Sequence, residues 1–419
     1  MRILFFAVSC ILLTGCSEMG GASPSQGSRS TNELPGLRSF SRQGPITPLA
    51  GTSYKVVYSF AGPSDGSNPN GLIAVSGTLY GTTVGGGADG GGTVIAITSA
   101  GKERVVYSFH KNTRDGSSPY APLLESSGTF YGTTSSGGTA YGYGTVFSVT
   151  KAGVEHVLYR FKGGEDGENP DSALVELNGV MYGTTPAGGG KYGNGTVFAI
   201  DPAGHERVLF RFTDPRVAQQ PHGGLVALNG DLYGTTTYGG IRNGGTVFEI
   251  SPSGKERVIH SFKANTRDGM LPRAKLIAWN GNLYGTTVAG GGSHKCSDGC
   301  GTVFEVTLSG TEKVLYRFQS RRDGFEPFSR LLESKGVLYG TTPDGGNLFC
   351  YQGSYKASGC GTVFKLTSPG VETVLHSFKG PPSDGTAPLA GLTSLGGTLY
   401  GTTESGGSKN AGTVFRITP

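Results

Sequence analysis

The four residues Tyr-Gly-Thr-Thr occur seven times in this chain, and this repetition limits the possible folds more than any other feature. A second motif, Gly-Thr-Val followed by an apolar residue, also occurs seven times, and so does a third of the type Tyr-Ser-Phe. The motifs keep the same order, which indicates one structural unit repeated seven times. The Tyr-Gly-Thr-Thr copies begin at Tyr80, Tyr131, Tyr182, Tyr233, Tyr284, Tyr339 and Tyr400, with spacings of 51 to 61 residues.

Residues 172–212 illustrate one repeat. Short runs rich in β-branched and aromatic residues predict strands at 173–177, 180–185, 196–200 and 207–212. Asn178-Gly179 between the first two runs is typical of a two-residue hairpin turn, in which both residues need positive φ. The Gly of Tyr-Gly-Thr-Thr is expected to let a neighbouring backbone approach closely. A Gly-rich loop separates the second and third runs. No window has a helical apolar period, so each repeat is expected to be a four-stranded antiparallel meander.

Seven such meanders predict an all-β chain, a seven-bladed β-propeller, because each blade needs neighbours to cover both of its faces. The last repeat ends at "GTVFRITP", after its third strand, and the missing fourth strand is found in "TSYKVVYSF" at residues 52–60. We therefore expect Tyr54–Phe60 to pair with Thr413–Thr418 and close the ring, which removes exposed strand edges. The alternative, an open β-solenoid, has no use for a split repeat.

The ordered motifs L-Y-G-T-T, G-G, G-T-V-F and G-x-E-x-V-L-Y-x-F resemble the bacterial GloVer tandem-repeat family over about residues 52–419. The resemblance implies an extracytoplasmic protein of a family that carries varied membrane or surface anchors. It transfers no catalytic residue. Kelch repeats also contain Gly-Gly pairs, but the Trp expected in each kelch repeat is absent, and the chain has one Trp, Trp279.

The N-terminus predicts a lipoprotein. Arg2 and the apolar run from Ile3 to Leu13 form a signal-peptide pattern. Leu13-Thr14-Gly15-Cys16 resembles the bacterial lipobox, which implies cleavage before Cys16 and lipidation of that residue. The predicted divisions are a signal peptide at 1–15, a lipidated tether at 16–45 and a propeller at 46–419. Ser17 implies outer-membrane or surface location if the cell is Gram-negative. An ordinary secretory signal remains the alternative.

Strand alternation places the Gly-rich loops and the links between repeats on one face, which we call the upper face. Six links carry Asp-Gly-x-x-Pro, and the fourth has Val217-Ala218 in place of Asp-Gly. Six carboxylates around a ring are compatible with Ca²⁺ sites, but the alternating acids of an EF-hand are missing. We expect the Asp side chains to accept hydrogen bonds from backbone N–H groups in turns. Arg114, Arg267 and Arg322 precede three of these Asp residues and are candidate anion contacts or solvated loop charges.

Aromatic residues outside the repeat consensus also fall in the upper loops. Exposed rings suit sugar or peptide recognition, and packing onto the Gly-rich loops is the alternative. The candidates are Tyr141, Tyr143, Tyr192, Tyr238, Phe349, Tyr351 and Tyr355.

Four cysteines remain after Cys10 and Cys16, and each pair lies in a lengthened upper loop. In an oxidising compartment they predict disulfides, Cys296 with Cys300 and Cys350 with Cys360, with cross-pairing as an alternative. A zinc site that includes the cysteines and His294 is the other alternative, but Cys350 and Cys360 are ten residues apart, which is longer than the usual spacing of zinc ligands. We expect no metal and no cofactor.

No nucleophile elbow, phosphate loop or catalytic triad order stands out. The net charge of +5 over 419 residues gives no case for nucleic acid. The sequence thus favours a monomeric, non-catalytic module that binds an envelope glycan or protein, with its binding surface near repeats 5 and 6. A propeller enzyme acting on polysaccharide and a purely structural surface spacer are the alternatives.

Overall fold

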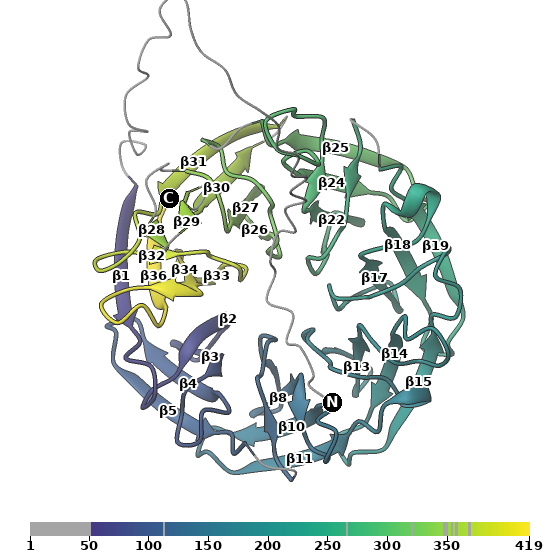
Figure 1. The fold of residues 1–419 in the computed structure, drawn as a ribbon, viewed down its shortest axis with the longest axis horizontal. Helices are drawn as coiled ribbons and strands as arrows, with labels where there is room; N and C mark the ends of the chain where they lie inside the picture. The colour runs from purple at the N-terminus through teal and green to yellow at the C-terminus, as the bar shows by residue number, and fades with distance from the viewer. Residues whose placement is uncertain are drawn as a thin grey trace, which may run out of the picture. The chain divides into compact units, whose positions relative to one another are not determined.

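The computed structural model describes residues 52–111, 114–264, 267–319, 322–346, 359–367 and 370–419, together with the backbone of 351–352 and 355–356. These residues all belong to one compact unit, Pro45–Pro419. They form seven four-stranded antiparallel sheets arranged as blades of one ring (Figure 1). The predicted seven-bladed β-propeller is therefore confirmed.

Six blades are continuous in sequence. Blade 1 contains β2 (Ser67–Val75), β3 (Thr78–Gly85), β4 (Thr93–Thr98) and β5 (Glu103–Ser108). Blade 2 contains β7 (Leu124–Ser126), β8 (Thr129–Thr134), β10 (Thr145–Thr150) and β11 (Glu155–Arg160). Blade 3 contains β12 (Val175–Leu177), β13 (Val180–Thr185), β14 (Thr196–Ile200) and β15 (Glu206–Arg211). Blade 4 contains β16 (Leu225–Leu228), β17 (Asp231–Thr236), β18 (Thr246–Ile250) and β19 (Glu256–Ser261).

Blade 5 contains β21 (Ile277–Trp279), β22 (Asn282–Thr287), β24 (Thr302–Val306) and β25 (Glu312–Arg317). Blade 6 contains β26 (Leu332–Ser334), β27 (Val337–Thr342), β30 (Thr362–Thr367) and β31 (Val371–Ser377). Blade 7 is split, with β33 (Thr393–Leu395), β34 (Thr398–Thr403) and β36 (Thr413–Thr418) from one end of the chain and β1 (Ser53–Ser59) from the other. The first strand of blade 3 begins two residues later than expected, at Val175.

Short elements complete the description. Two 3₁₀ turns occur, η1 (Gly164–Asp166) and η2 (Ile241–Asn243). Short pairs join β6 (Gly116–Ser117) to β9 (Ser136–Gly137), β20 (Gly269–Met270) to β23 (Ala289–Gly290), β28 (Tyr351–Gln352) to β29 (Tyr355–Lys356), and β32 (Gly385–Thr386) to β35 (Ser405–Gly406).

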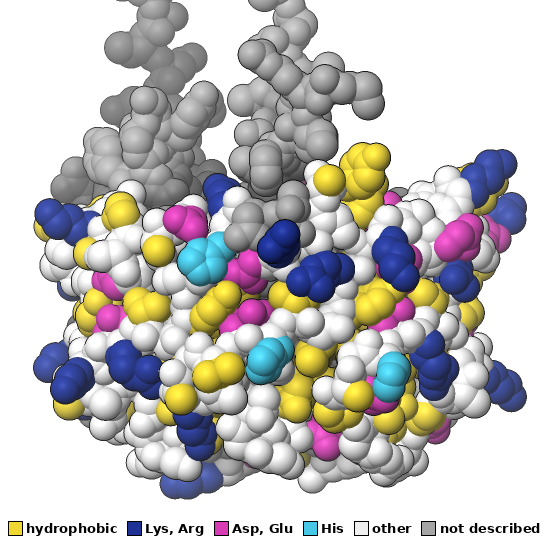
Figure 2. All heavy atoms as spheres, turned by 90° about the horizontal axis from the view of Figure 1, so that it is seen from below, with side chains coloured by type: hydrophobic (Ala, Val, Ile, Leu, Met, Phe, Trp, Pro, Cys, Tyr) yellow, Lys and Arg dark blue, Asp and Glu magenta, His cyan; other side chains and the backbone are white. Residues whose placement is uncertain are grey.

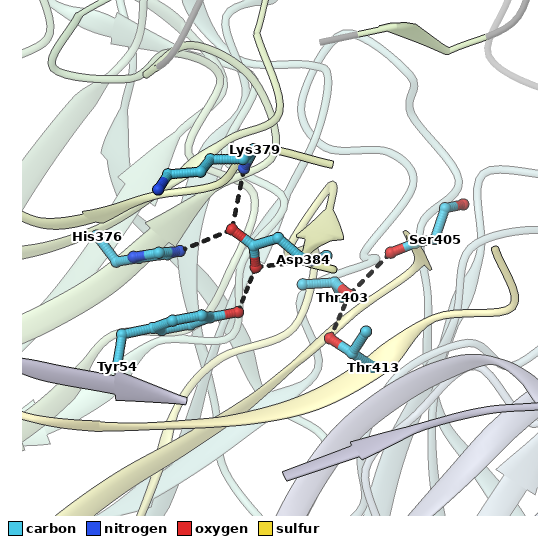
Figure 3. Close-up of polar contacts among 8 residues, drawn as sticks. Tyr54, His376, Lys379, Asp384, Thr403, Ser405 and Thr413 are labelled. Atoms are coloured by element: carbon cyan, nitrogen blue, oxygen red, sulfur yellow. Dashed lines mark hydrogen bonds and ion pairs between the residues drawn. The ribbon is translucent and has the colours of Figure 1, made fainter. Parts of the chain in front are cut away.

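The ring closes as the sequence predicts. Tyr54 pairs with Ile417, and Ser59 pairs with Thr413, in an antiparallel register with one irregularity after Val56. The side chains of the same junction reinforce the backbone pairing, because the Tyr54 hydroxyl donates to Asp384 Oδ1 at 2.5 Å (Figure 3). Strands from the two ends of the described chain thus form one blade.

The threonines of Tyr-Gly-Thr-Thr explain why the motif recurs. In every blade the second Thr hydroxyl lies 2.7–2.8 Å from the Thr hydroxyl of Gly-Thr-Val on the adjacent strand, and both are buried. The first Thr reaches the next blade: Thr82 Oγ1 donates to the carbonyl of Ala121, and Thr402 Oγ1 donates to that of Asn70. Each copy therefore ties its own sheet together, and six of the seven also bond the following link.

The core lies between the blades. The Phe of the Tyr-Ser-Phe motif packs edge-to-face on the Phe of Gly-Thr-Val-Phe in the next blade, as Phe161 does on Phe198 with centroids 5.2 Å apart. Both rings are fully buried, and the edge-to-face contact adds roughly 0.5–1.5 kcal/mol beyond burial. Six junctions share this arrangement. At the seventh, Phe60 meets Ile95 within the same apolar cluster.

The Gly of Tyr-Gly-Thr-Thr has a different role from the one expected. We expected it to admit a neighbouring backbone. A Cβ added to Gly183 would instead lie 2.5 Å from the Phe198 ring and 2.9 Å from Leu174. The space is therefore taken by core side chains of the same blade, and glycine is required because any side chain would displace that ring.

Candidate functional site

The upper face is built by pairing each link with the Gly-rich loop of the blade that it enters. The link residue two positions after the Asp forms a β-bridge with a residue of the Gly-rich loop. That loop residue lies two positions after the second Thr of Tyr-Gly-Thr-Thr. Examples are Gln219 with Tyr238 and Phe325 with Asp344. Equivalent pairs occur in every blade. The predicted placement of links and loops on one face is therefore observed, and the pairing makes that face a rigid support for variable side chains.

The Asp residues of the links form turns. Asp65 accepts the backbone N–H groups of Ala61 and Gly62 at 2.9–3.0 Å and the Tyr58 hydroxyl at 2.6 Å. The expectation of backbone-bonded turns is thus met at this link. In the fourth link, Asp214 has a similar function, because it accepts the backbone N–H of Arg216 at 3.0 Å.

Five link Asp residues also face a glutamate from the fourth strand of the blade that the link enters. Burial, followed by the nearby Asp65 carboxylate, raises the pKa of Glu103 to about 7. Burial and the adjacent Asp323 raise the pKa of Glu372 to about 8. A protonated glutamate beside an ionised aspartate avoids two like charges in a poorly solvated site. We call each such group an inter-blade junction. It consists of the link Asp, the side chain at the Tyr position of the Tyr-Ser-Phe motif, and the fourth-strand residue that faces them. Glu155 and Glu206 repeat the pattern with pKa values of about 7.

Two junctions have histidine, His260 or His376, where four others have tyrosine. His260 Nδ1 lies 3.3 Å from the Gly310 carbonyl, and its Nε2 has no hydrogen-bond partner. Among the described residues, the His260, Asp268 and Glu312 ligand atoms lie within 4.8 Å of one another. However, Asp268 already accepts the N–H groups of Lys263 and Gly269, and the facing Glu occurs at neighbouring junctions without histidine. We therefore assign this group to blade packing.

The predicted aromatic candidates divide into two groups. Tyr141 is 79% exposed and Tyr192 is 59% exposed, and they occupy the same position in the loops of blades 2 and 3, three residues before Gly-Thr-Val. Tyr143 instead packs down, because a Cβ on Gly163 would lie 2.6 Å from its ring. Tyr238 is partly buried and held by the pairing with Gln219.

The remaining aromatic candidates belong to the loop of blade 6. Phe349 lies outside the described residues, and Tyr351 and Tyr355 are described only as backbone in a short hairpin. The expected focus of binding near repeats 5 and 6 stays a prediction. The cationic candidates Arg114, Arg267 and Arg322 are all exposed, and the first two use their carbonyls to accept hydrogen bonds from Arg160 and Arg317.

The loop of blade 5 contains a disulfide and a pocket. Cys296 and Cys300 are bonded, as expected, with their Cα atoms 5.3 Å apart. Cys360 is also disulfide-bonded, and its expected partner Cys350 lies outside the described residues, as does Cys16. The pocket has a volume of about 350 Å³ and is lined by Met270, His294, Cys296 and Asp298 among others. His294 thus lies beside a disulfide rather than free thiolates.

A second group of variable residues lies where the links enter the innermost strands, directly after the conserved Pro. His222 Nδ1 lies 2.7 Å from Asp171 Oδ2, and the Arg273 guanidinium lies 5.6 Å from the centre of the Phe328 ring. Burial, then the charges of Glu404 and Asp171, raise the pKa of Tyr120. The candidates predicted from the sequence do not include these residues. Variation between repeats could have indicated them, since each blade has a different residue at this position.

Charge on the side of the ring is mixed. In Figure 2, Lys and Arg side chains are interspersed with Asp, Glu and His side chains. Within the part of the chain that the structure describes, no helix has the length and apolar character needed to cross a membrane.

The sequence matches a known repeat family, and the fold is similar to those of solved structures. The Gloeobacter/Verrucomicrobia repeat matches residues 42–192 and 187–415. A crystal structure of puromycin hydrolase is similar with a TM-score of 0.52 at 14% identity, covering 83% of this chain and 52% of that one. A gluconolactonase from Xanthomonas campestris has a TM-score of 0.42 at 14% identity, covering 71% and 88% of the two chains. No curated protein matches significantly. The chain spans about half of the hydrolase, and at this identity the likeness concerns the fold alone.

Proposed function

The chain belongs to the Gloeobacter/Verrucomicrobia repeat family, and on that premise we propose that it is a non-catalytic binding module of the bacterial cell envelope. In this proposal acyl chains on Cys16 anchor the chain, and residues 17–45 are a flexible tether that spans roughly 30 Å as a random coil. The propeller then presents its upper face to an envelope glycan or protein. The lipobox-like sequence before Cys16 supports the anchor.

The main support for this proposal is that the blades differ from one another at the upper face. The blades share their core motifs almost residue for residue, whereas the position three residues before Gly-Thr-Val differs between them: it is Asp89 in blade 1, tyrosine in blades 2 and 3, and Arg242 in blade 4. Tyr141 and Tyr192 expose most of their side chains although the fold offers Tyr143 a packed position nearby. The Tyr141 ring also stacks on Tyr143, with centroids 5.8 Å apart, but most of its surface and that of Tyr192 is free to contact a ligand.

Tyrosine suits this use on physical grounds. A tyrosine ring offers a flat apolar face and a hydroxyl while losing few side-chain rotamers on binding. Sugar rings and extended peptides both present complementary apolar faces with polar edges. Lys191 lies 5.2 Å from the centre of the Tyr192 ring, so a polar group is already present beside the ring.

The test uses the full chain. Replacing Tyr141 and Tyr192 together by Ser should reduce retention on isolated envelope polysaccharide or envelope protein fractions by roughly tenfold or more. Val154→Ser with Val371→Ser is the matched control, because these residues are 52% and 59% exposed at the opposite face, in the turn before β11 and at the start of β31. Equal retention of both double variants would overturn the proposal and favour a structural spacer.

One observation favours a second candidate, an enzyme that acts on polysaccharide. Such an enzyme needs carboxylates outside the repeat consensus at one end of the ring, and the Asp171–His222 pair meets part of that requirement. His222→Gln should then abolish release of new reducing ends from envelope polysaccharide while leaving retention unchanged. Absence of release by the unmodified chain would exclude this candidate for the polysaccharides assayed.

A further inference from the structure

A ring of seven equivalent residues surrounds the axis of the propeller. Each directly precedes a leucine that lies within an innermost strand in blade 1 and at or one residue before its start in the other blades. A Cβ added to Gly71 would lie 2.6 Å from Pro122, and one added to Gly391 would lie 2.7 Å from the Arg330 carbonyl. Neighbouring members are therefore in contact from blade to blade. The ring consists of Gly71, Pro122, Ala173, Gly224, Lys275, Arg330 and Gly391.

Two adjacent members of this ring are cations, and the other five are small and uncharged. Lys275 Nζ extends past Gly224 to the carbonyl of Leu174, two blades away, at 3.5 Å. Both Lys275 and Arg330 are partly exposed. The other five members carry no charge and no polar side-chain group.

The two charges are not compensated. Among the described residues no carboxylate forms an ion pair with either cation. Burial, and then the charge of Arg330, lower the pKa of Lys275 to about 7. A nearby carboxylate would shift it in the opposite direction. Below about pH 7, where Lys275 is mainly protonated, the two like charges therefore cost stability in the free protein.

We propose that Lys275 and Arg330 bind a small oxyanion, a carboxylate or phosphate group, at the axis of the ring. The arginine guanidinium donates two parallel N–H bonds to such a group, and the lysine ammonium adds a third donor and a compact charge. The Leu174 carbonyl fixes the position of the ammonium. The site is separate from the exposed tyrosines of the upper face and does not depend on the proposed glycan-binding role.

Calorimetric titration of the full chain tests the site. At fixed ionic strength in chloride, the chain should bind potassium phosphate or galacturonate, and neutral galactose should not bind. Comparing the two anions distinguishes a phosphate ligand from a carboxylate ligand. Lys275→Met and Arg330→Met should each weaken binding by roughly tenfold, and Arg330→Lys should weaken it less than Arg330→Met. Lys313→Met and Arg242→Gln, at exposed positions, should leave the affinity unchanged.

A second measurement keeps the proposal testable if a variant folds poorly. Removing one of two uncompensated cations should raise the melting temperature in chloride and should abolish the further rise caused by phosphate or galacturonate. Tyr141→Ser with Tyr192→Ser should leave anion binding intact. Lack of binding to either anion, or equal binding by the Lys275→Met, Arg330→Met double variant, would overturn the proposal.

Discussion

The phenol ring of Tyr54 lies parallel to the imidazole of His376, with centroids 3.5 Å apart, although one residue belongs to the first strand and the other to β31. The two side chains also share Asp384, because Tyr54 donates to Oδ1 and His376 Nε2 lies 3.1 Å from Oδ2 (Figure 3). At the other junctions a glutamate occupies the position of Tyr54. The closing junction therefore replaces a buried acid by a neutral hydrogen-bond donor.

Tyr54→Phe should destabilise the ring because it removes a partly buried hydrogen bond to a carboxylate. Such bonds contribute about 1.5–3 kcal/mol, and urea unfolding monitored by intrinsic fluorescence measures the loss. Tyr192→Phe removes only an exposed hydroxyl and should change the free energy of unfolding by less than about 0.5 kcal/mol. Equal stability of the two variants would contradict the role assigned to Tyr54.

The junction glutamates predict that the free energy of unfolding decreases as the pH rises from about 5 to about 8. Their pKa values are raised on folding, so as pH rises the unfolded chain releases its protons first and unfolding becomes more favourable. Converting Glu103, Glu155, Glu206 and Glu372 together to Gln mimics the protonated form and should flatten the dependence of melting temperature on pH in this window. Glu125 and Glu333 bond turn N–H groups at exposed sites, and their conversion to Gln should leave the slope unchanged.

Gly183→Ala should lower the free energy of unfolding because the added methyl group has no room. The added methyl would lie 2.5 Å from Phe198, and overpacking of this kind costs about 1–3 kcal/mol or more. Gly77→Ala provides the comparison, because its surroundings are open but its φ is +81°, and that strain costs about 1 kcal/mol. A smaller loss for Gly183→Ala than for Gly77→Ala in thermal unfolding would show that the ring of Phe198 can move aside.

Removing the disulfide of blade 5 should have a modest effect. Cys296→Ser with Cys300→Ser opens a loop with a sequence separation of only 4, and loop-closure entropy for so short a loop is about 2 kcal/mol. The free energy of unfolding should fall by no more than this amount, and a reducing agent should reproduce the part of the loss due to this bond. A loss of several kcal/mol would mean that Cys300, which is fully buried, also contributes through packing.

Features that repeat along the chain could be predicted from the sequence. The Tyr-Gly-Thr-Thr and Gly-Thr-Val motifs recur in order, so the strands, the blade count and the pairing of residues 54–60 with 413–418 follow from linear spacing. Gly183 was interpreted as a site of backbone approach because the sequence does not show that Phe198 turns back over it. The neighbour of a glycine is set by side-chain packing, and spacing does not encode it.

The candidate sites were harder to predict because they depend on differences between blades. Lys275 and Arg330 are ordinary residues in a linear reading, and their proximity appears only when equivalent positions are brought around one axis. The exposed state of Tyr141 and the partly buried state of Tyr143 could not be separated either, since both have the same residue type in the same loop. Tyr143 packs on Gly163 of the following link, and Tyr141 stacks on the outer side of Tyr143.

The split blade also determines the order in which the protein can be completed. β1 precedes the other strands in the chain and its partner β36 follows them, so the hydrogen-bonding edge of β1 has no partner until Thr413–Thr418 has been synthesised. Unpaired strand edges associate readily with other chains. A chain that stops before Thr413 would therefore leave this edge unpaired and should be prone to aggregation.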